Sequence, residues 1–172
     1  DADYTFAASA TSDYAGRVAG AGDINGDGLD DFLIGAYGAA TSAGETYLFF
    51  GENLGSTATL SLTDDADYLF SGESTYTHSG ISVDGIGDID DNGLDDLIIG
   101  AYYHSGPNGS RAGKAYVVLG ESLGSNTSPS LSSADYELLG SNSYDYAGQS
   151  VASAGDVNGD GRPDLVHTTN TG

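Results

Sequence analysis

The sequence contains no cysteine, no methionine and no tryptophan, and only four of its 172 residues are lysine or arginine. Without cysteine, the chain has neither a disulfide framework nor a thiolate metal site. It also lacks an apolar run of about 18 residues, the minimum for a membrane-spanning helix, so no membrane insertion is expected. The absence of methionine, with Asp1 as first residue, leads us to expect a processed protein that is secreted or at the cell surface.

Cations are scarce, since Lys114 and three arginines face 26 acidic residues, and the formal charge is −22. Nucleic acids and anionic membranes are bound by basic surfaces, so this charge excludes both as expected partners. Strong acidity can indicate disorder, but 12 tyrosines and 5 phenylalanines in short apolar runs favour a folded domain. The 27 glycines have no period of three, which indicates tight turns and not collagen.

The sequence does contain an internal repeat. The segment "GDINGDGLDDFLIGAY" at 22–37 returns as "GDIDDNGLDDLIIGAY" at 87–102 and as "GDVNGDGRPDLVHTT" at 155–169. A second segment, "AGETYLFFG" at 43–51, returns once, at 112–120, and an "ADY" segment occurs three times. Repetition at a roughly constant period indicates a repeat architecture.

Short runs rich in Val, Ile, Tyr and Phe alternate with Gly, Asn, Asp and Ser in every repeat. They are too short for helices and predict strands. In the first repeat the runs are 18–21, 32–36, 47–50 and 68–70. Four strands in about 65 residues are typical of a propeller blade, so the sequence predicts an all-β fold of four-stranded antiparallel blades.

An acidic loop separates the first two predicted strands of each repeat. Positions one, three, five and nine carry oxygen side chains, position six is glycine, and position seven offers a backbone carbonyl. Calcium takes six to eight oxygen ligands of these kinds. A polar Asn-Gly or Asp-Gly turn is the alternative, but three copies with one spacing favour three Ca²⁺ sites. The predicted ligands are Asp23, Asn25, Asp27, Leu29 and Asp31; Asp88, Asp90, Asn92, Leu94 and Asp96; and Asp156, Asn158, Asp160, Arg162 and Asp164.

The loops differ from EF-hands, which close with a glutamate at position twelve between two helices. Position twelve here is Ile34, Ile99 or His167, inside an apolar run. Each ion is therefore expected to cross-link a strand-to-strand hairpin. The extra acids Asp30, Asp91 and Asp95 are expected to face solvent or to lie just outside the ligands.

These segments resemble FG-GAP repeats, the units of integrin α-subunit β-propellers, which also occur in bacterial and archaeal surface proteins. Aromatic-glycine segments precede the loops as "YAGRVAG" at 14–20, "HSGISVDG" at 78–85 and "YAGQSVAS" at 146–153, and "IGAY" follows the first two loops. The resemblance implies calcium ligands at the positions chosen above and a structural or adhesive role. The chain departs from the family pattern in having Tyr for the proline of Gly-Ala-Pro and "VHTT" in the third repeat.

The family's strand order divides the single repeat domain 1–172 into four parts. These are an orphan outer strand and linker at 1–12, a blade at 13–72, a second blade at 73–141 and a partial third blade at 142–172. Integrin propellers have seven blades, so about two and a half blades leave open sheet edges. The expected partners are other blades of a larger propeller, or other copies that complete blades between chains in a ring or filament. A third hypothesis is an accessory domain of a secreted hydrolase.

No catalytic motif is evident, and we predict that the chain is not an enzyme. "GISVDG" at 80–85 has Asp84 where a nucleophile elbow needs glycine. "GSRAGKA" at 109–115 lacks the first glycine and the Ser or Thr of a phosphate loop. The recurrent tyrosines are expected to pack between blades; they are Tyr4, Tyr47, Tyr68, Tyr116 and Tyr136. The alternative is that exposed tyrosines bind a sugar, so a protein or glycan ligand is a further candidate partner.

Overall fold

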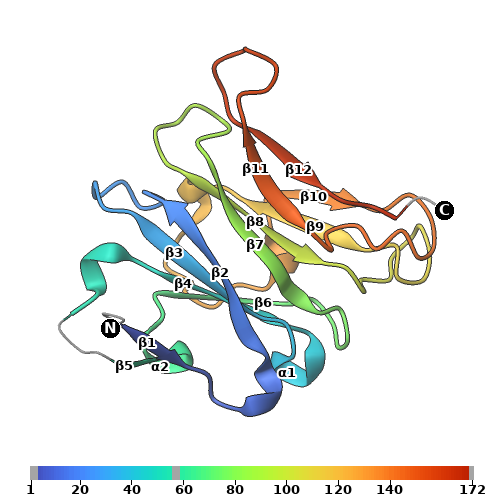
Figure 1. Ribbon diagram of the computed structural model, residues 1–172, viewed down its shortest axis with the longest axis horizontal. Helices are drawn as coiled ribbons and strands as arrows, with labels where there is room; N and C mark the ends of the chain where they lie inside the picture. Colours follow the sequence, from blue (N-terminus) through green and yellow to red (C-terminus); the bar gives the residue numbers. More distant parts are fainter. Residues whose placement is uncertain (1–3, 56–58, 171–172) are drawn as a thin grey trace.

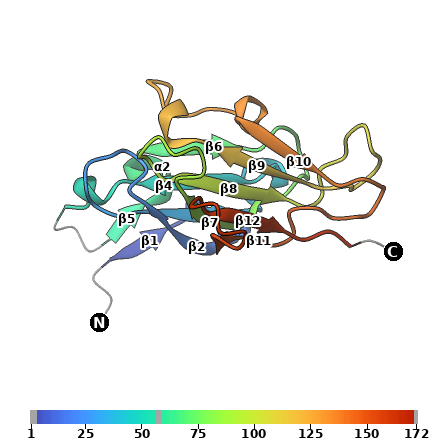
Figure 2. The same cartoon turned by 90° about the horizontal axis from the view of Figure 1, so that it is seen from above.

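The computed structural model describes residues 4–55 and 59–170 and consists of three antiparallel sheets and one short parallel pair of strands (Figures 1 and 2). Blade 1 has the strand order β2-β3-β4-β6, formed by Ala15–Gly22, Asp31–Ala36, Glu45–Phe49 and Tyr68–Ser71. Blade 2 has the order β7-β8-β9-β10, formed by Ser79–Gly87, Asp96–Ala101, Lys114–Val118 and Tyr136–Leu139. In both blades the strand after the acidic loop is second and the "ADY" strand is outermost. The predicted all-β fold with four-stranded blades is confirmed.

The third repeat forms the two-stranded sheet β11 (Val151–Gly155) and β12 (Asp164–His167). Figure 2 places the first strands β2, β7 and β11 along one side of the molecule, and the outer strands β6 and β10 along the other. The short helical elements are α1 (Ala39–Ser42), α2 (Leu62–Asp65), η1 (Thr11–Asp13), η2 (Gly51–Asn53), η3 (Gly120–Ser122) and η4 (Leu131–Ser133). No helix within the described ranges is long and apolar enough to cross a membrane.

The N-terminal "ADY" strand, expected to lack a blade of its own, packs against blade 1. Strand β1 (Thr5–Ala7) pairs in parallel with β5 (Thr59–Ser61), with Phe6 opposite Leu60. The same contact recurs one blade later, where Ser71 at the end of β6 forms a parallel bridge with Ser130. The strand β1 therefore occupies, against blade 1, the place that β6 occupies against blade 2.

Hydrophobic clusters lie on both faces of each complete blade, because neighbouring side chains on a strand point to opposite faces. Leu33 of β3 packs in a cluster with Leu97 of β8, between blades 1 and 2. Ile34, the next residue, belongs to a cluster on the opposite face that includes Phe6 of β1. Strands β3 and β8 are thus buried on both sides, which explains their continuous apolar sequence.

Glycines in the second strands allow neighbouring blades to approach closely. A Cβ on Gly100 of β8 would overlap the carbonyl oxygen of Gly148, just before β11, and a Cβ on Gly35 of β3 would overlap that of Gly80. The glycine of the repeated "IGA" segment is therefore required by contact between blades.

We expect Gly100→Ala to lower the free energy of unfolding by about 1–3 kcal/mol, since the new methyl group forces two backbones apart. Urea unfolding measures this loss. Gly20→Ala in β2 is the matched control, because a Cβ there meets nothing within 4 Å, and it should be neutral or slightly stabilising. Equal stability of the two variants would contradict the proposed close contact.

Candidate metal centres

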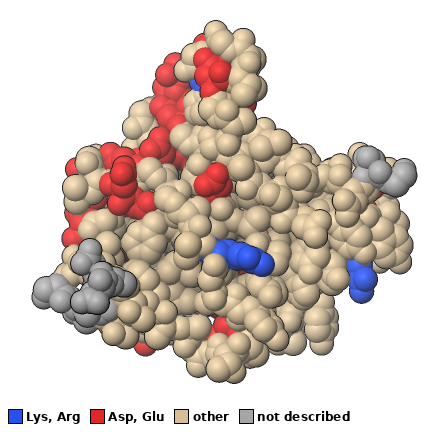
Figure 3. Space-filling view, viewed as in Figure 1, with Lys and Arg blue, Asp and Glu red and all other residues tan. Residues whose placement is uncertain are grey.

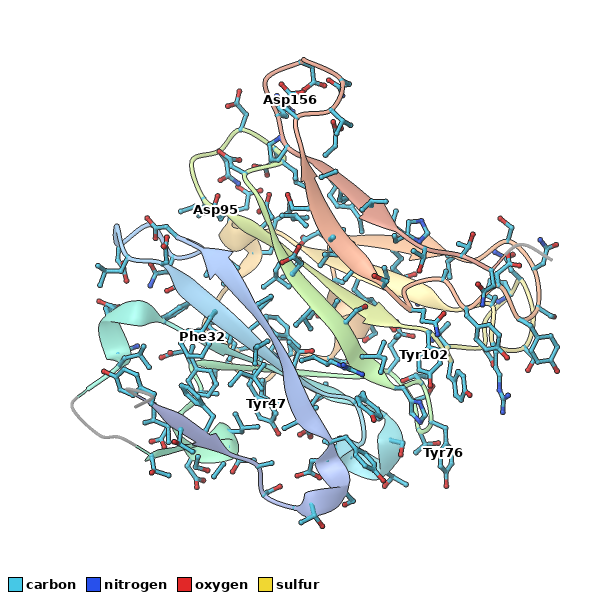
Figure 4. All side chains as sticks on the ribbon, in the orientation of Figure 1. Phe32, Tyr47, Tyr76, Asp95, Tyr102 and Asp156 are labelled. Carbon is cyan, nitrogen blue, oxygen red and sulfur yellow. The ribbon has the colours of Figure 1, made fainter. Side chains whose placement is uncertain are left out.

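The acidic loops are hairpins that join the first and second strands of each sheet, at one end of the molecule (Figure 4). The aspartate at position one organises the loop by accepting backbone N–H groups. Asp23 accepts from Gly26, Asp27 and Gly28 at 2.8–2.9 Å. Asp156 accepts from the three corresponding residues, and Asp88 accepts from Asn92 and Gly93 at 2.9 and 2.7 Å.

The glycine at position six is needed for the backbone turn. Gly28, Gly93 and Gly161 have φ values of 90°, 92° and 94°, in a region that other residues rarely adopt. The N–H of the next residue then donates to the side chain at position five, at 2.7 Å from Leu29, 2.8 Å from Leu94 and 2.9 Å from Arg162. The loop therefore folds back over its own polar side chains.

The aspartate at position nine ties the loop to the sheet. Asp31 accepts the N–H of Ile24 at 3.0 Å and of Gly51, after β4, at 2.9 Å. In blade 2, Asp96 accepts the equivalent pair, Ile89 and Gly120, both at 2.9 Å. Both carboxylates are buried. Asp164 of the third loop is only half-buried and accepts the N–H of Val157 at 2.9 Å.

Burial raises the pKa of both Asp31 and Asp96 above the ordinary aspartate value, although their backbone hydrogen bonds lower it. The carboxylates at positions one and five of the first loop, and at one and three of the second, raise it further. Asp88 behaves differently: burial opposes its ionisation, but N–H donors such as Gly93 outweigh that effect, so its pKa is lowered. Each of the first two loops thus holds a carboxylate whose charged form is disfavoured mainly by burial and further by like charges, and a cation would relieve the repulsion between those charges.

The second loop brings three carboxylates together. Ligand oxygens of Asp88, Asp90 and Asp96 all lie within 4.8 Å of one another. Two oxygens on opposite sides of a Ca²⁺ ion, each at 2.3–2.6 Å, are separated by about 5 Å. The three carboxylates therefore fit around a single calcium ion with little movement.

In the first and third loops the amide at position three turns toward the acid at position five. Asn25 donates to Asp27 at 2.8 Å, and Asn158 donates to Asp160 at 3.0 Å. Asn158 also donates to Asp164 at 3.2 Å. In these two loops, the amide N–H groups therefore donate to the same carboxylates that the sequence predicts as calcium ligands.

A family model supports the repeat pattern at sequence level. It is described as the FG-GAP repeat and matches residues 15–49, from β2 to β4, and 147–169, around β11 and β12. The chain belongs to the FG-GAP repeat family. The second FG-GAP unit lies outside the matched ranges, but blade 2 has the same strand order as blade 1.

Integrin alpha chains are similar to this FG-GAP protein. Integrin alpha-5 of Xenopus laevis is 31% identical over 174 residues, which covers 95% of this chain. Integrin alpha-4 of Xenopus laevis is 31% identical over 158 residues, or 89% of the chain, and integrin alpha-IIb of Mus musculus is 36% identical over 90 residues, or 52%. The chain spans only 15%, 14% and 8% of the lengths of these three relatives.

Sequence reasoning missed two acids that connect one FG-GAP unit to the next. Asp95, expected to face solvent or lie beside the ligands, accepts the N–H of Asp23 at 2.9 Å and returns its own N–H to the Asp23 carbonyl at 3.1 Å. Asp84 accepts the N–H of Ser153 at 2.9 Å, which joins blade 2 to the third sheet. For Asp95, the available signal was an acid immediately before position nine, which the first loop shares as Asp30.

Proposed function

We propose that the chain is a calcium-stabilised FG-GAP module of a secreted or cell-surface protein, with a structural or adhesive role and no catalytic activity. The convergence of Asp88, Asp90 and Asp96 on one point is the observation that carries the calcium assignment. The similarity to integrin alpha chains supports a place at the cell surface. Extracellular calcium modules work with dissociation constants of about 10⁻⁴–10⁻³ M, which suits loops as exposed as the third one.

The proposed ligands in each loop are the side chains at positions one, three, five and nine and the carbonyl at position seven. Bound calcium would neutralise carboxylates that the protein holds close together and would fix the hairpin between the first two strands. Asp31 and Asp96 would transmit this effect to the third strand, because they already bond to Gly51 and Gly120. The role of the ion is therefore structural.

Isothermal titration calorimetry tests this proposal, and we expect about three Ca²⁺ per chain. Asp90→Ala should remove one site, because Asp90 belongs to the second cluster. Among the described residues, its side chain accepts only the N–H of Asn92, at 3.2 Å, so its loss should disturb the fold little. The control is Asp64→Ala in α2, which lies outside the loops and accepts from Ser61. An unchanged stoichiometry in Asp90→Ala, or no calcium binding to the chain, would refute the assignment.

Self-association is a second candidate, supported by the sheet edges. Within the part of the chain that the structure describes, β12 pairs only with β11, and β1 pairs only with β5. Unpaired strand edges recruit other strands, so copies could complete blades between chains. Sedimentation velocity with and without calcium separates the candidates: a concentration-dependent oligomer supports assembly, and a monomer at all concentrations rules it out.

A further inference from the structure

A continuous row of aromatic rings lies at the end of the sheets opposite the acidic loops. The aromatic row consists of Tyr37, His78, Tyr102, Tyr103 and Tyr146, with neighbouring ring centroids 4.1–6.1 Å apart. Its rings come from segments that follow β3 and β8 or precede β7 and β11. Figure 4 places Tyr102 far from Asp95 and Asp156 of the loops.

The row is open to solvent at both ends. Tyr14 stacks on Tyr37 at 5.3 Å and is 60% exposed, and Tyr144 lies 6.2 Å from Tyr146 and is 54% exposed. The first ring of each repeat is held in the left-handed backbone region, with φ of 50° at Tyr14, 55° at His78 and 53° at Tyr146. Bulky residues avoid this conformation, and it concentrates at functional sites.

Both arginines that lie outside the loops are at this row. The guanidinium of Arg111 lies 4.5 Å from the ring centre of Tyr103, and that of Arg17 lies 5.8 Å from that of Tyr37. The other two cations of the chain face carboxylates: Lys114 pairs with two glutamates, and Arg162 lies near Asp91. Among the described residues, Arg17 and Arg111 form no salt bridge, although the chain has 26 acids.

Charge is therefore separated along the molecule. On the face in Figure 3, most acidic side chains gather over the loop end, and two basic patches lie away from them. The arginines are free to attract an anion to the aromatic row, while the acidic loops repel it.

A groove of about 580 Å³ runs from the row along the first strands of the blades. Tyr102 lies in both the row and the groove, and Arg17, Ser82, Gln149 and Ser150 supply polar groups to its wall. Ligand sites commonly have this volume and a few polar groups among apolar surfaces. The groove and the row form one surface of ring faces, hydroxyls, an amide and two guanidinium groups.

We propose that the aromatic row and its groove bind an acidic saccharide, such as a chain of uronic acids. The C–H faces of sugar rings pack on the electron-rich faces of tyrosine, and guanidinium groups pair with carboxylates in a bidentate manner. The exposed rings that flank the row, Tyr14 and Tyr144, are tyrosines. Of the exposed aliphatic side chains, Val18 lines the groove, whereas Leu29, Leu139, Val157 and Val166 lie outside both the groove and the row. Phenol-rich surfaces with arginine suit a polyhydroxylated anion better than an apolar peptide. This inference goes beyond the proposed calcium role and does not rest on it.

Calorimetric titration of the whole chain in saturating calcium tests the inference with three probes. Oligogalacturonate carries the sugar rings and the carboxylates, its methyl ester keeps the rings without the charge, and poly-glutamate carries the charge without the rings. We expect oligogalacturonate to bind and both other probes to bind at least tenfold more weakly. Equal binding of the methyl ester, stronger binding of poly-glutamate, or no binding of oligogalacturonate would overturn the proposal.

The double variant Arg17→Gln/Arg111→Gln should weaken oligogalacturonate binding about tenfold or more, since each lost charge-assisted contact removes affinity. Ser125→Asp/Thr127→Asp is the matched control, because it lowers the net charge by the same two units at exposed positions outside the row and the groove, and it should leave the affinity unchanged. Equal melting temperatures would establish that all variants are folded. If the double variant binds oligogalacturonate as tightly as the original chain, the two arginines do not hold the saccharide and the proposal is wrong.

Discussion

Removing calcium should lower the melting temperature of this FG-GAP chain by about 10 °C. A ligand that binds only the folded state at ten times its dissociation constant stabilises it by about 1.4 kcal/mol per site. Three sites together contribute about 4 kcal/mol, and for a domain of this size each kcal/mol shifts the melting temperature by about 2–4 °C. The physical source is the repulsion among carboxylates such as Asp88, Asp90 and Asp96, whose oxygens lie within 4.8 Å of one another.

Differential scanning calorimetry in calcium and in chelator measures this shift. Sodium chloride at matched ionic strength is the necessary control, because any salt screens the formal charge of −22. Magnesium should stabilise less than calcium, since it prefers a smaller octahedral site and retains its waters. If calcium raises the melting temperature no more than sodium does, the loops are polar turns and the calcium proposal fails.

Much of the fold could be predicted because each repeat carries its own local signals. Alternation of short apolar runs and turns predicted the strands, and the resemblance to FG-GAP repeats implied their order within a blade. The loop spacing also predicted a feature that the structure explains locally: Gly28, Gly93 and Gly161 have nearly the same positive φ. Such patterns depend on neighbours within a few residues, which a sequence displays directly.

Contacts between blades could not be predicted in the same way. Asp95 bonds to Asp23, 72 residues away, and Lys114 bonds to Glu73, 41 residues away. Both depend on how far one blade is rotated and shifted against the next, and no local pattern encodes that geometry. The aromatic row likewise joins rings from three repeats, and no local pattern in the sequence indicated that these rings meet.

Lys114 makes one of these contacts between blades, and its replacement should have a second large effect on stability. Lys114 of β9 is 4% exposed, and its ammonium group bonds to Glu73 at 2.9 Å and to Glu137 at 2.8 Å. It also lies 5.0 Å from the ring centre of the buried Tyr116. We expect Lys114→Met to lower the free energy of unfolding by about 3–5 kcal/mol, because it leaves two facing carboxylates without a cation.

The loss should be recovered when the acids are also neutralised. In the triple variant Lys114→Met/Glu73→Gln/Glu137→Gln no charge is left uncompensated, so its stability should return close to that of the original chain. Urea unfolding at neutral pH compares the three proteins. A triple variant as unstable as Lys114→Met would contradict the charge argument and would assign the loss to packing.

Acidification gives an independent check of the same ion pair. Burial raises the pKa of Glu73, but the hydrogen bond and charge of Lys114 outweigh burial, so its pKa lies below the ordinary glutamate value. A lowered carboxylate pKa stabilises the folded state above the unfolded-state pKa of about 4.3, and this contribution disappears as the pH falls through the folded-state pKa. The stability difference between the original chain and Lys114→Met should therefore be largest near neutral pH and shrink below about pH 4. A difference that stays constant down to pH 3 would show that Lys114 stabilises the blade through its aliphatic chain and not through its charge.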